Sequence, residues 1–93
     1  MKAKSTKSPW QLGKLYFIRT VTNYLLGKLT RVTDQELVLE DCAWVACTGR
    51  FAEALKSGKL DEVEPYPDGS VIVGRGAVVD ACLWSHGLQR TVL

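Results

Sequence analysis

The chain has 93 residues, a net charge of +2 and a hydrophobic fraction of 46%, which corresponds to one small domain. No apolar run is long enough for a membrane-spanning helix or a signal peptide, so we expect no membrane association and a cytoplasmic location. The three cysteines, Cys42, Cys47 and Cys82, have neither the even count of a disulfide framework nor the CxxC spacing of a zinc site. We therefore expect reduced thiols and no metal site.

The charge is distributed unevenly along the chain. Residues 1–31 carry seven basic side chains and no acid, whereas residues 32–68 carry nine acids and three basic side chains. A basic segment attracts anions such as nucleic acid or nucleotide phosphate. The alternative is a soluble tail together with oppositely charged faces that attract each other between subunits. We expect residues 1–11 to form a flexible basic tail, which Trp10 is placed to pin, and residues 12–93 to form a single β-rich domain.

Residues 14–41 predict a meander of three short strands. Aromatic and β-branched residues over 14–21 indicate the first strand, and Thr22 and Asn23 supply a turn. The second strand, over 24–32, contains Gly27, which marks a bulge or a sharp bend where a sheet curls. A turn over 33–35 leads to a third strand over 36–41, which the apolar residues up to Cys47 can extend.

The second half of the chain predicts one helix and two further strands. Residues 49–58 indicate a helix of about two turns, with Thr48 as N-cap and Gly58 as its C-terminal stop. The acidic segment 59–69 contains two prolines and predicts a surface loop. Residues 70–73 and 77–84 indicate the fourth and fifth strands, separated by a turn at Arg75. The apolar end of the chain is placed to add a strand to this sheet or to that of a neighbour.

The expected fold is therefore mainly β with five strands and one short helix. A meander with a glycine-bent second strand is typical of a small SH3-like or Sm-like barrel, or of a curled antiparallel sheet. A domain of this size has a modest core, so we also expect it to associate as a homo-oligomer.

The residues contain no recognisable catalytic constellation. His86 is the single histidine, no nucleophile has a recognisable base, and the adjacent acids Glu40 and Asp41 point to opposite faces of a strand. We expect a protein that is not an enzyme and has no cofactor.

The candidate ligand contacts are three arginines and two aromatic residues. Arg75 lies between two glycines and is expected to be a mobile, exposed cation; Arg50 lies at the start of the predicted helix, where anions bind. Arg19 is a further candidate for a phosphate. Trp84 and Tyr66 lie at element edges or loops, where an aromatic ring stacks on a base or, alternatively, packs between subunits.

The order of features resembles a family of small, uncharacterised phage-encoded proteins. The resemblance covers roughly residues 14–60 and rests on Ile18-Arg19-Thr20, Gly27-Lys28-Leu29, Glu36-Leu37-Val38-Leu39, Ala43-Trp44, Gly49 and Leu55. The basic N-terminal extension and the turn at Arg75 are not part of it. The family has no established activity to transfer; the resemblance implies a phage origin and expression in the bacterial host cytoplasm.

Two classes of function follow. The first is a phage binding protein for a nucleotide-like ligand, such as a host immune signal that it sequesters, or for host nucleic acid. The alternative is a structural or protein-interaction module, either a virion component or an inhibitor of a host protein.

Overall fold

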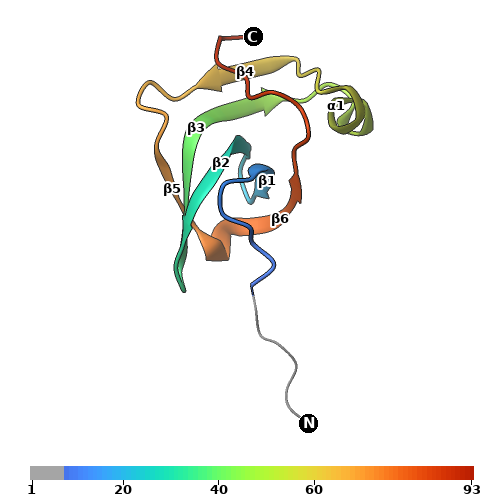
Figure 1. The fold of residues 1–93 in the computed structure, drawn as a ribbon. Helices are drawn as coiled ribbons and strands as arrows, with labels where there is room; N and C mark the ends of the chain where they lie inside the picture. The colour runs from blue at the N-terminus through green and yellow to red at the C-terminus, as the bar shows by residue number, and fades with distance from the viewer. Residues whose placement is uncertain (1–7) are drawn as a thin grey trace.

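The computed structural model describes residues 8–93, which form a β-rich domain around one curled antiparallel sheet (Figure 1). The sheet is open rather than closed into a barrel, since β5 and β6 do not pair, so the curled-sheet form of the predicted fold is the one observed. Its strands follow the order β4-β3-β2-β1-β6, and β5 pairs with β3. In chain order the elements are β1 (Leu15–Thr20), β2 (Tyr24–Val32), β3 (Glu36–Cys47), α1 (Phe51–Ser57), β4 (Glu62–Pro65), β5 (Val71–Gly74), the short 3₁₀ helix η1 (Arg75–Ala77) and β6 (Val78–Leu83).

The predicted meander is confirmed, and the pairing of β2 with β3 is irregular at Gly27. The register of β2 against β3 shifts between Leu26 and Lys28, on either side of Gly27. A Cβ at Gly27 would lie 3.2 Å from Leu39 Cβ and from Cys42 Cα. Glycine therefore lets β3 approach β2 more closely than any larger residue would permit.

Strand β3 is long because its outer edge is shared by two partners. Its first half pairs with β5 and its second half with β4, so β4 and β5 together resemble one interrupted strand. Between the two halves Asp41 has a φ of 52°, a left-handed conformation that is uncommon for a residue other than glycine. The chain over 66–70 spans this break, where the N–H of Cys42 donates to the carbonyl of Gly69.

The acidic segment is therefore not a loop throughout, and the count of five strands is wrong. Residues Glu62–Pro65 form β4, an additional strand that brings the total in the described residues to six. Val63 is buried, whereas Glu62 and Glu64 are exposed, which is the alternation of a strand with one covered face. The acids and prolines obscure this pattern, and Pro65 fits because it stands at the end of the strand.

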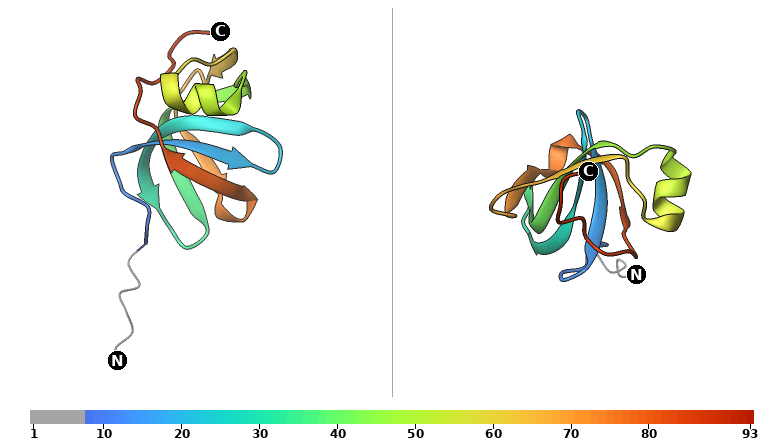
Figure 2. Two further views of the ribbon diagram at one scale, coloured as in Figure 1. Left: turned by 90° about the vertical axis from the view of Figure 1, so that its right-hand side faces the viewer. Right: turned by 90° about the horizontal axis from the view of Figure 1, so that it is seen from above.

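Apolar side chains pack on both faces of the sheet. The cluster on one face contains Tyr16, Ile18, Leu25, Leu29, Leu37, Leu39, Cys42 and Val73. The cluster on the opposite face contains Phe17, Leu26, Ala43, Val45, Ala54, Leu60, Val63 and Trp84. Helix α1 covers this second face at one end of the sheet (Figure 2).

The C-terminal segment leaves β6, passes α1 and ends beside β4 (Figure 1). Leu93 exchanges two backbone hydrogen bonds with Val63 at the β4 edge, but residues 91–93 form no strand, so the predicted addition to this sheet is limited to that one residue pair. At the other end of the chain, Trp10 makes an edge-on contact with Tyr16, with ring centroids 5.1 Å apart. The remaining residues of the predicted tail, 1–7, lie outside the described part of the chain.

Candidate functional site

Arg19 lies on β1 with its guanidinium already bound to a carboxylate. Its Nε donates to Asp80 Oδ1 at 3.1 Å, and its Nη2 donates to Oδ2 of the same residue. The hydrogen bond and then the charge of Asp80 raise the pKa of Arg19. An anionic ligand must therefore compete with Asp80 for this cation.

Arg75 is half-buried and tethered, so the expectation of a mobile, exposed cation is wrong. Its backbone N–H donates to the carbonyl of Gln35, and its Nη1 donates to the carbonyl of Thr33. Both carbonyls belong to the turn between β2 and β3. The guanidinium thus joins η1, which directly follows β5, to that turn.

Arg50, the third predicted cation, is exposed at the N-cap of α1. The predicted cap, Thr48, is buried, and its hydroxyl donates to the carbonyl of Gly49 instead of accepting a helix N–H. Since the helix has seven residues and no side-chain cap hydrogen bond, the Thr48 prediction is wrong. Arg50 stands beside a short, uncapped helix and not in a formed anion site.

The two predicted aromatic contacts have different environments. Trp84 is 4% exposed, stacks on Phe17 with ring centroids 5.7 Å apart, and donates its Nε1–H to the carbonyl of Gly87. Trp84 therefore packs inside the domain, and its ring faces are open neither to a base nor to a neighbouring subunit. Tyr66 lies in the loop after β4 and is exposed. Its pKa is raised, first by the partial burial of the side chain and then by the charge of Cys42.

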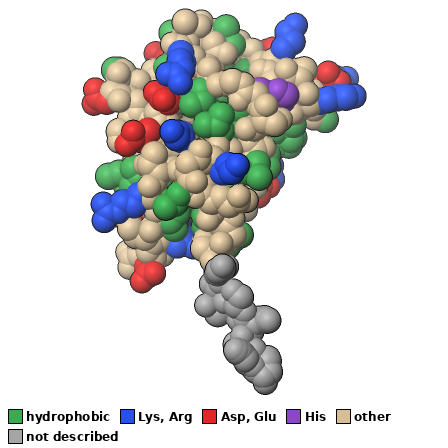
Figure 3. Space-filling view, viewed as in Figure 1, with side chains coloured by type: hydrophobic (Ala, Val, Ile, Leu, Met, Phe, Trp, Pro, Cys, Tyr) green, Lys and Arg blue, Asp and Glu red, His purple; other side chains and the backbone are tan. Residues whose placement is uncertain are grey.

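The five predicted contacts do not converge. Among the most pronounced hollows in the surface of residues 8–93, each is lined by at most one of these five residues. On the face shown in Figure 3, basic and acidic side chains are interspersed. The uneven charge along the sequence therefore does not produce a uniformly basic surface on this face.

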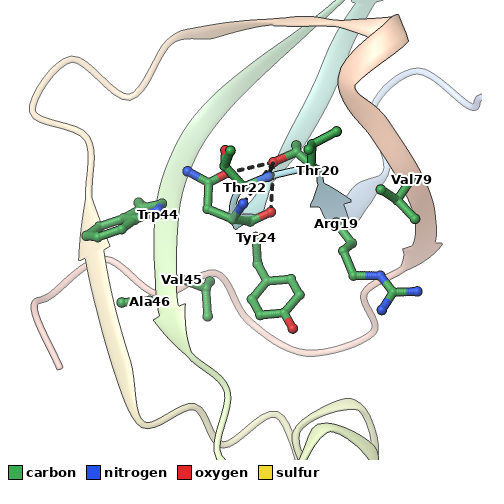
Figure 4. Close-up of a pocket in the computed structure, with 10 residues that line it drawn as sticks. Arg19, Thr20, Thr22, Tyr24, Trp44, Val45, Ala46 and Val79 are labelled. Carbon is green, nitrogen blue, oxygen red and sulfur yellow. Dashed lines mark hydrogen bonds between the residues drawn. The ribbon is translucent and has the colours of Figure 1, made fainter.

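A hollow of about 450 Å³ surrounds the turn between β1 and β2, and we call it the hairpin hollow. The turn itself is fixed by Thr20, whose Oγ1 donates to the carbonyl of Asn23 at 2.9 Å and accepts from the N–H of Asn23 at 3.0 Å. Figure 4 shows the ring of Tyr24 and the side chain of Arg19 extending to the same side of the turn, while the indole of Trp44 points toward β4. The hollow thus brings a cation and an aromatic ring together, but Trp44 faces elsewhere.

Trp44 is the residue that sequence reasoning missed. It is 38% exposed on β3, between the buried Ala43 and Val45, and it lines three hollows: the hairpin hollow and two further ones of about 200 and 320 Å³. We call the two further hollows together the Trp44 surface, which is lined by Trp44, Ala46, Glu62, Val63, Glu64, Pro65, Tyr66, Pro67, Val92 and Leu93.

The Trp44 surface is apolar and aromatic with an acidic margin. Trp44 lies directly opposite Glu64 in the register of β3 against β4. No ion pair joins Glu62 or Glu64 to another residue within 8–93. The sequence signal for this surface was the Glu-Val-Glu-Pro alternation, which places both carboxylates on the exposed side of a strand beside Trp44.

The side chains of His86 and Cys42, which could act as an acid–base group or a nucleophile, are both held by packing contacts or burial. His86 Nε2 donates to the carbonyl of Leu55 at 2.8 Å, and the ring lies edge-on to Trp84. Burial raises the pKa of the Cys42 thiol to about 12, so this thiol stays protonated at neutral pH. Within residues 8–93 no three His, Cys, Asp or Glu side chains are placed to hold a metal ion.

No protein-family model matches this sequence, and comparisons with curated proteins and with solved structures found no similar protein. The described residues contain no helix of the length and apolarity that crossing a membrane requires.

Proposed function

We propose that this protein is a non-catalytic binding module that recognises an extended segment of a protein partner at the Trp44 surface. The observation that carries the proposal is the exposed indole of Trp44 at the meeting point of three hollows. Tryptophan is the residue type most enriched among the dominant contacts of protein interfaces. An exposed tryptophan on a rigid strand, surrounded by shallow apolar hollows, is already positioned to contact a bound partner.

The lining of the surface supports a particular kind of partner. Prolines and aromatic rings form the grooves in which extended, proline-containing peptides dock, and Pro65, Tyr66 and Pro67 lie beside Trp44 here. Glu62 and Glu64 add negative charge at the margin. A partner segment with apolar or proline residues and one or more lysines or arginines complements both features, since a cation also binds the face of an aromatic ring.

The surroundings of the two best-placed reactive groups support the absence of catalysis. The ring of His86 is held against the end of α1 by its hydrogen bond to Leu55. The raised pKa of Cys42 keeps its sulfur in the unreactive thiol form. Both groups are accounted for by packing.

Selection of binders from a random dodecapeptide display library tests the proposal. We expect enriched peptides to be basic and rich in proline or apolar residues, and Trp44→Ala to weaken their binding about tenfold or more. Ile72→Ala is the matched control, because Ile72 is exposed on β5 away from this surface. Enriched peptides that bind the Trp44→Ala protein as well as the unchanged one contradict the proposal.

A second candidate is a nucleotide-like ligand, favoured by the hairpin hollow. Its volume of about 450 Å³ falls within the usual range for small-molecule sites, and Tyr24 and Arg19 supply a ring for a base and a cation for a phosphate. The test is titration with mixed nucleoside mono- and diphosphates. Arg19→Ala should abolish binding, and Asp80→Asn should strengthen it by releasing Arg19; binding that neither variant alters removes this candidate.

Self-association, a phage origin and a place in the host cytoplasm complete the proposal. They rest on the modest core and on the resemblance of residues 14–60. Retained nucleotide in protein purified from bacteria would favour the second candidate, whereas one co-purifying host or virion protein, lost from Trp44→Ala, would favour the first.

A further inference from the structure

The last residues of the chain lie along the outer edge of β4. The N–H of Leu93 donates to the carbonyl of Val63 at 2.8 Å, and the N–H of Val63 donates to the carbonyl of Leu93 at 3.2 Å. Such a reciprocal pair is the hydrogen-bonded pair of an antiparallel ladder. A sheet edge is a template for a further strand, and at β4 a segment of the same chain occupies it (Figure 1). We call residues 90–93 the strap.

The strap covers part of the Trp44 surface. Counting away from Leu93 and Val63 in opposite directions places Val92 opposite Glu64. Glu64 in turn lies opposite Trp44 on β3, so the three side chains form one row across the sheet, on the same face. All three line the hollow of about 320 Å³. The site proposed for a partner is therefore already shared with residues of this chain.

Few contacts hold the strap in place. The side chains of Val92 and Leu93 are largely exposed and belong to neither buried cluster. Arg90 Nη2 lies 3.3 Å from Asp41 Oδ2, and both side chains are largely exposed. An exposed ion pair of this kind stabilises a structure little. The strap can therefore leave β4 without opening the core.

The strap also leaves one backbone group of the edge unused. The N–H of Tyr66 donates to the carbonyl of Cys42, so Tyr66 faces β3. Because facing alternates along an antiparallel strand, the carbonyl of Pro65 faces outward, as Val63 does. Thr91 lies opposite Pro65, yet no loop N–H within residues 8–93 donates to this carbonyl. A straighter strand on the same edge would gain a hydrogen bond that the strap does not make.

We propose that the strap is an autoinhibitory mimic of the partner segment, which binds the Trp44 surface as an added strand of β4 in the place of the strap. This inference rests on the proposed function and deepens it. The partner carries a cation at the place of Arg90 and an apolar side chain at that of Leu93. At the places of Thr91 and Leu93 it needs a backbone N–H, so neither residue is proline. The residue at the place of Val92 faces away from the β4 backbone and can be proline.

A reversible disulfide tests whether the strap must leave. The variant carries Val92→Cys and Glu64→Cys in a background of Cys47→Ser and Cys82→Ser. Its two new thiols belong to a non-hydrogen-bonded antiparallel pair, whose Cα atoms lie about 4.5 Å apart, within disulfide range. The probe is a fluorescein-labelled, amidated peptide that copies residues 88–93, and its binding is followed by anisotropy. We expect oxidation to weaken binding about tenfold or more, and reduction to restore it, because a covalently held strap cannot leave.

The outcomes separate the strap from the Trp44 surface itself. Failure to form the disulfide in a variant that circular dichroism shows to be folded overturns the register. A disulfide-linked dimer on a non-reducing gel overturns the contact within one chain. Equal peptide binding in both redox states, or no binding after reduction, overturns inhibition by the strap. If Trp44→Ala still weakens binding that oxidation leaves unchanged, the strap proposal fails alone and the proposed function stands.

Backbone methylation of the peptide tests the added strand on the unchanged protein. N-methylation of the last leucine removes the N–H that would donate to Val63 and should weaken binding about tenfold or more. N-methylation of the preceding valine, whose N–H faces away from β4, should change binding by less than about twofold. Leu93→Pro removes the same N–H from the strap and should strengthen binding of the unmethylated peptide, whereas Leu93→Ala keeps it and is the matched control. Equal effects of the two methylations, or of the two variants, overturn the proposal.

Discussion

His86 occupies the space that a side chain at Gly58 would need. A Cβ built on Gly58 would lie 2.6 Å from Cγ and 2.8 Å from Cβ of His86. Gly58 also has a φ of 79°, the left-handed conformation that ends α1, and its N–H donates to the carbonyl of Ala54. The end of the helix and the C-terminal segment are therefore fitted to each other at one glycine.

We expect Gly58→Ala to lower the free energy of unfolding by about 1 to 3 kcal/mol, through the strained φ and the displacement of His86. Urea unfolding followed by circular dichroism measures the change. Gly76→Ala is the control, because a Cβ there has no neighbour within 4 Å and no positive φ is recorded. Equal stability of the two variants would show that the contact between Gly58 and His86 does not constrain the fold.

Gly27→Ala should also destabilise the protein, by about 1 to 2 kcal/mol. The added methyl would press on Leu39 and Cys42 at 3.2 Å, where the buried core has little room to move. Gly74→Ala, in an open position of β5, should be neutral or slightly stabilising because alanine restricts the unfolded chain. The urea concentrations at the midpoints of unfolding are compared for the two variants. A Gly27→Ala midpoint at or above that of Gly74→Ala would contradict the close approach of β3 to β2 at Gly27.

The elements that local patterns specify were predictable from the sequence. The meander, the bend at Gly27 and the helix stop at Gly58 each depend on neighbouring residues and are confirmed. Strand β4 was not predicted, because its pairing with β3 is a long-range contact and its four residues carry two acids and a proline. Six strands are therefore present where five were expected.

The site was harder to predict because exposure depends on tertiary packing. Trp84 and Trp44 both occupy apolar stretches, yet one is buried by Phe17 and the other is open beside β4. The pairing of Arg19 with Asp80 and of Arg75 with Thr33 joins residues 61 and 42 positions apart. Such partners have no signature in the local sequence.

Stability should fall as the pH rises above about 9, because of Cys42. Burial raises the pKa of its thiol from 9.0 to about 12, so the folded state keeps the proton over a range in which the unfolded state loses it. The contribution is complete below pH 9 and is lost between pH 9 and about 12, by up to about 1.4 kcal/mol per pH unit. Cys42→Ala should show a shallower decline in urea unfolding over the same range; parallel pH profiles of the two proteins would contradict the assignment.

The last prediction separates a structural role of Arg75 from a ligand role. Arg75→Ala removes the hydrogen bond from the guanidinium to the carbonyl of Thr33 and keeps the backbone hydrogen bond to Gln35, so it should loosen the turn between β2 and β3. The expected loss is about 1 to 2 kcal/mol, near the lower end for hydrogen bonds from a charged donor because the site is half-buried. Arg31→Ala, an exposed arginine on β2, removes the same charge and should change stability by less than about 0.5 kcal/mol. Thermal unfolding compares the two variants, and nucleotide titration of both supplies the second readout. If Arg75→Ala unfolds like the unchanged protein but loses nucleotide binding that Arg31→Ala retains, the guanidinium serves a ligand, and the tether to Thr33 is incidental to the fold.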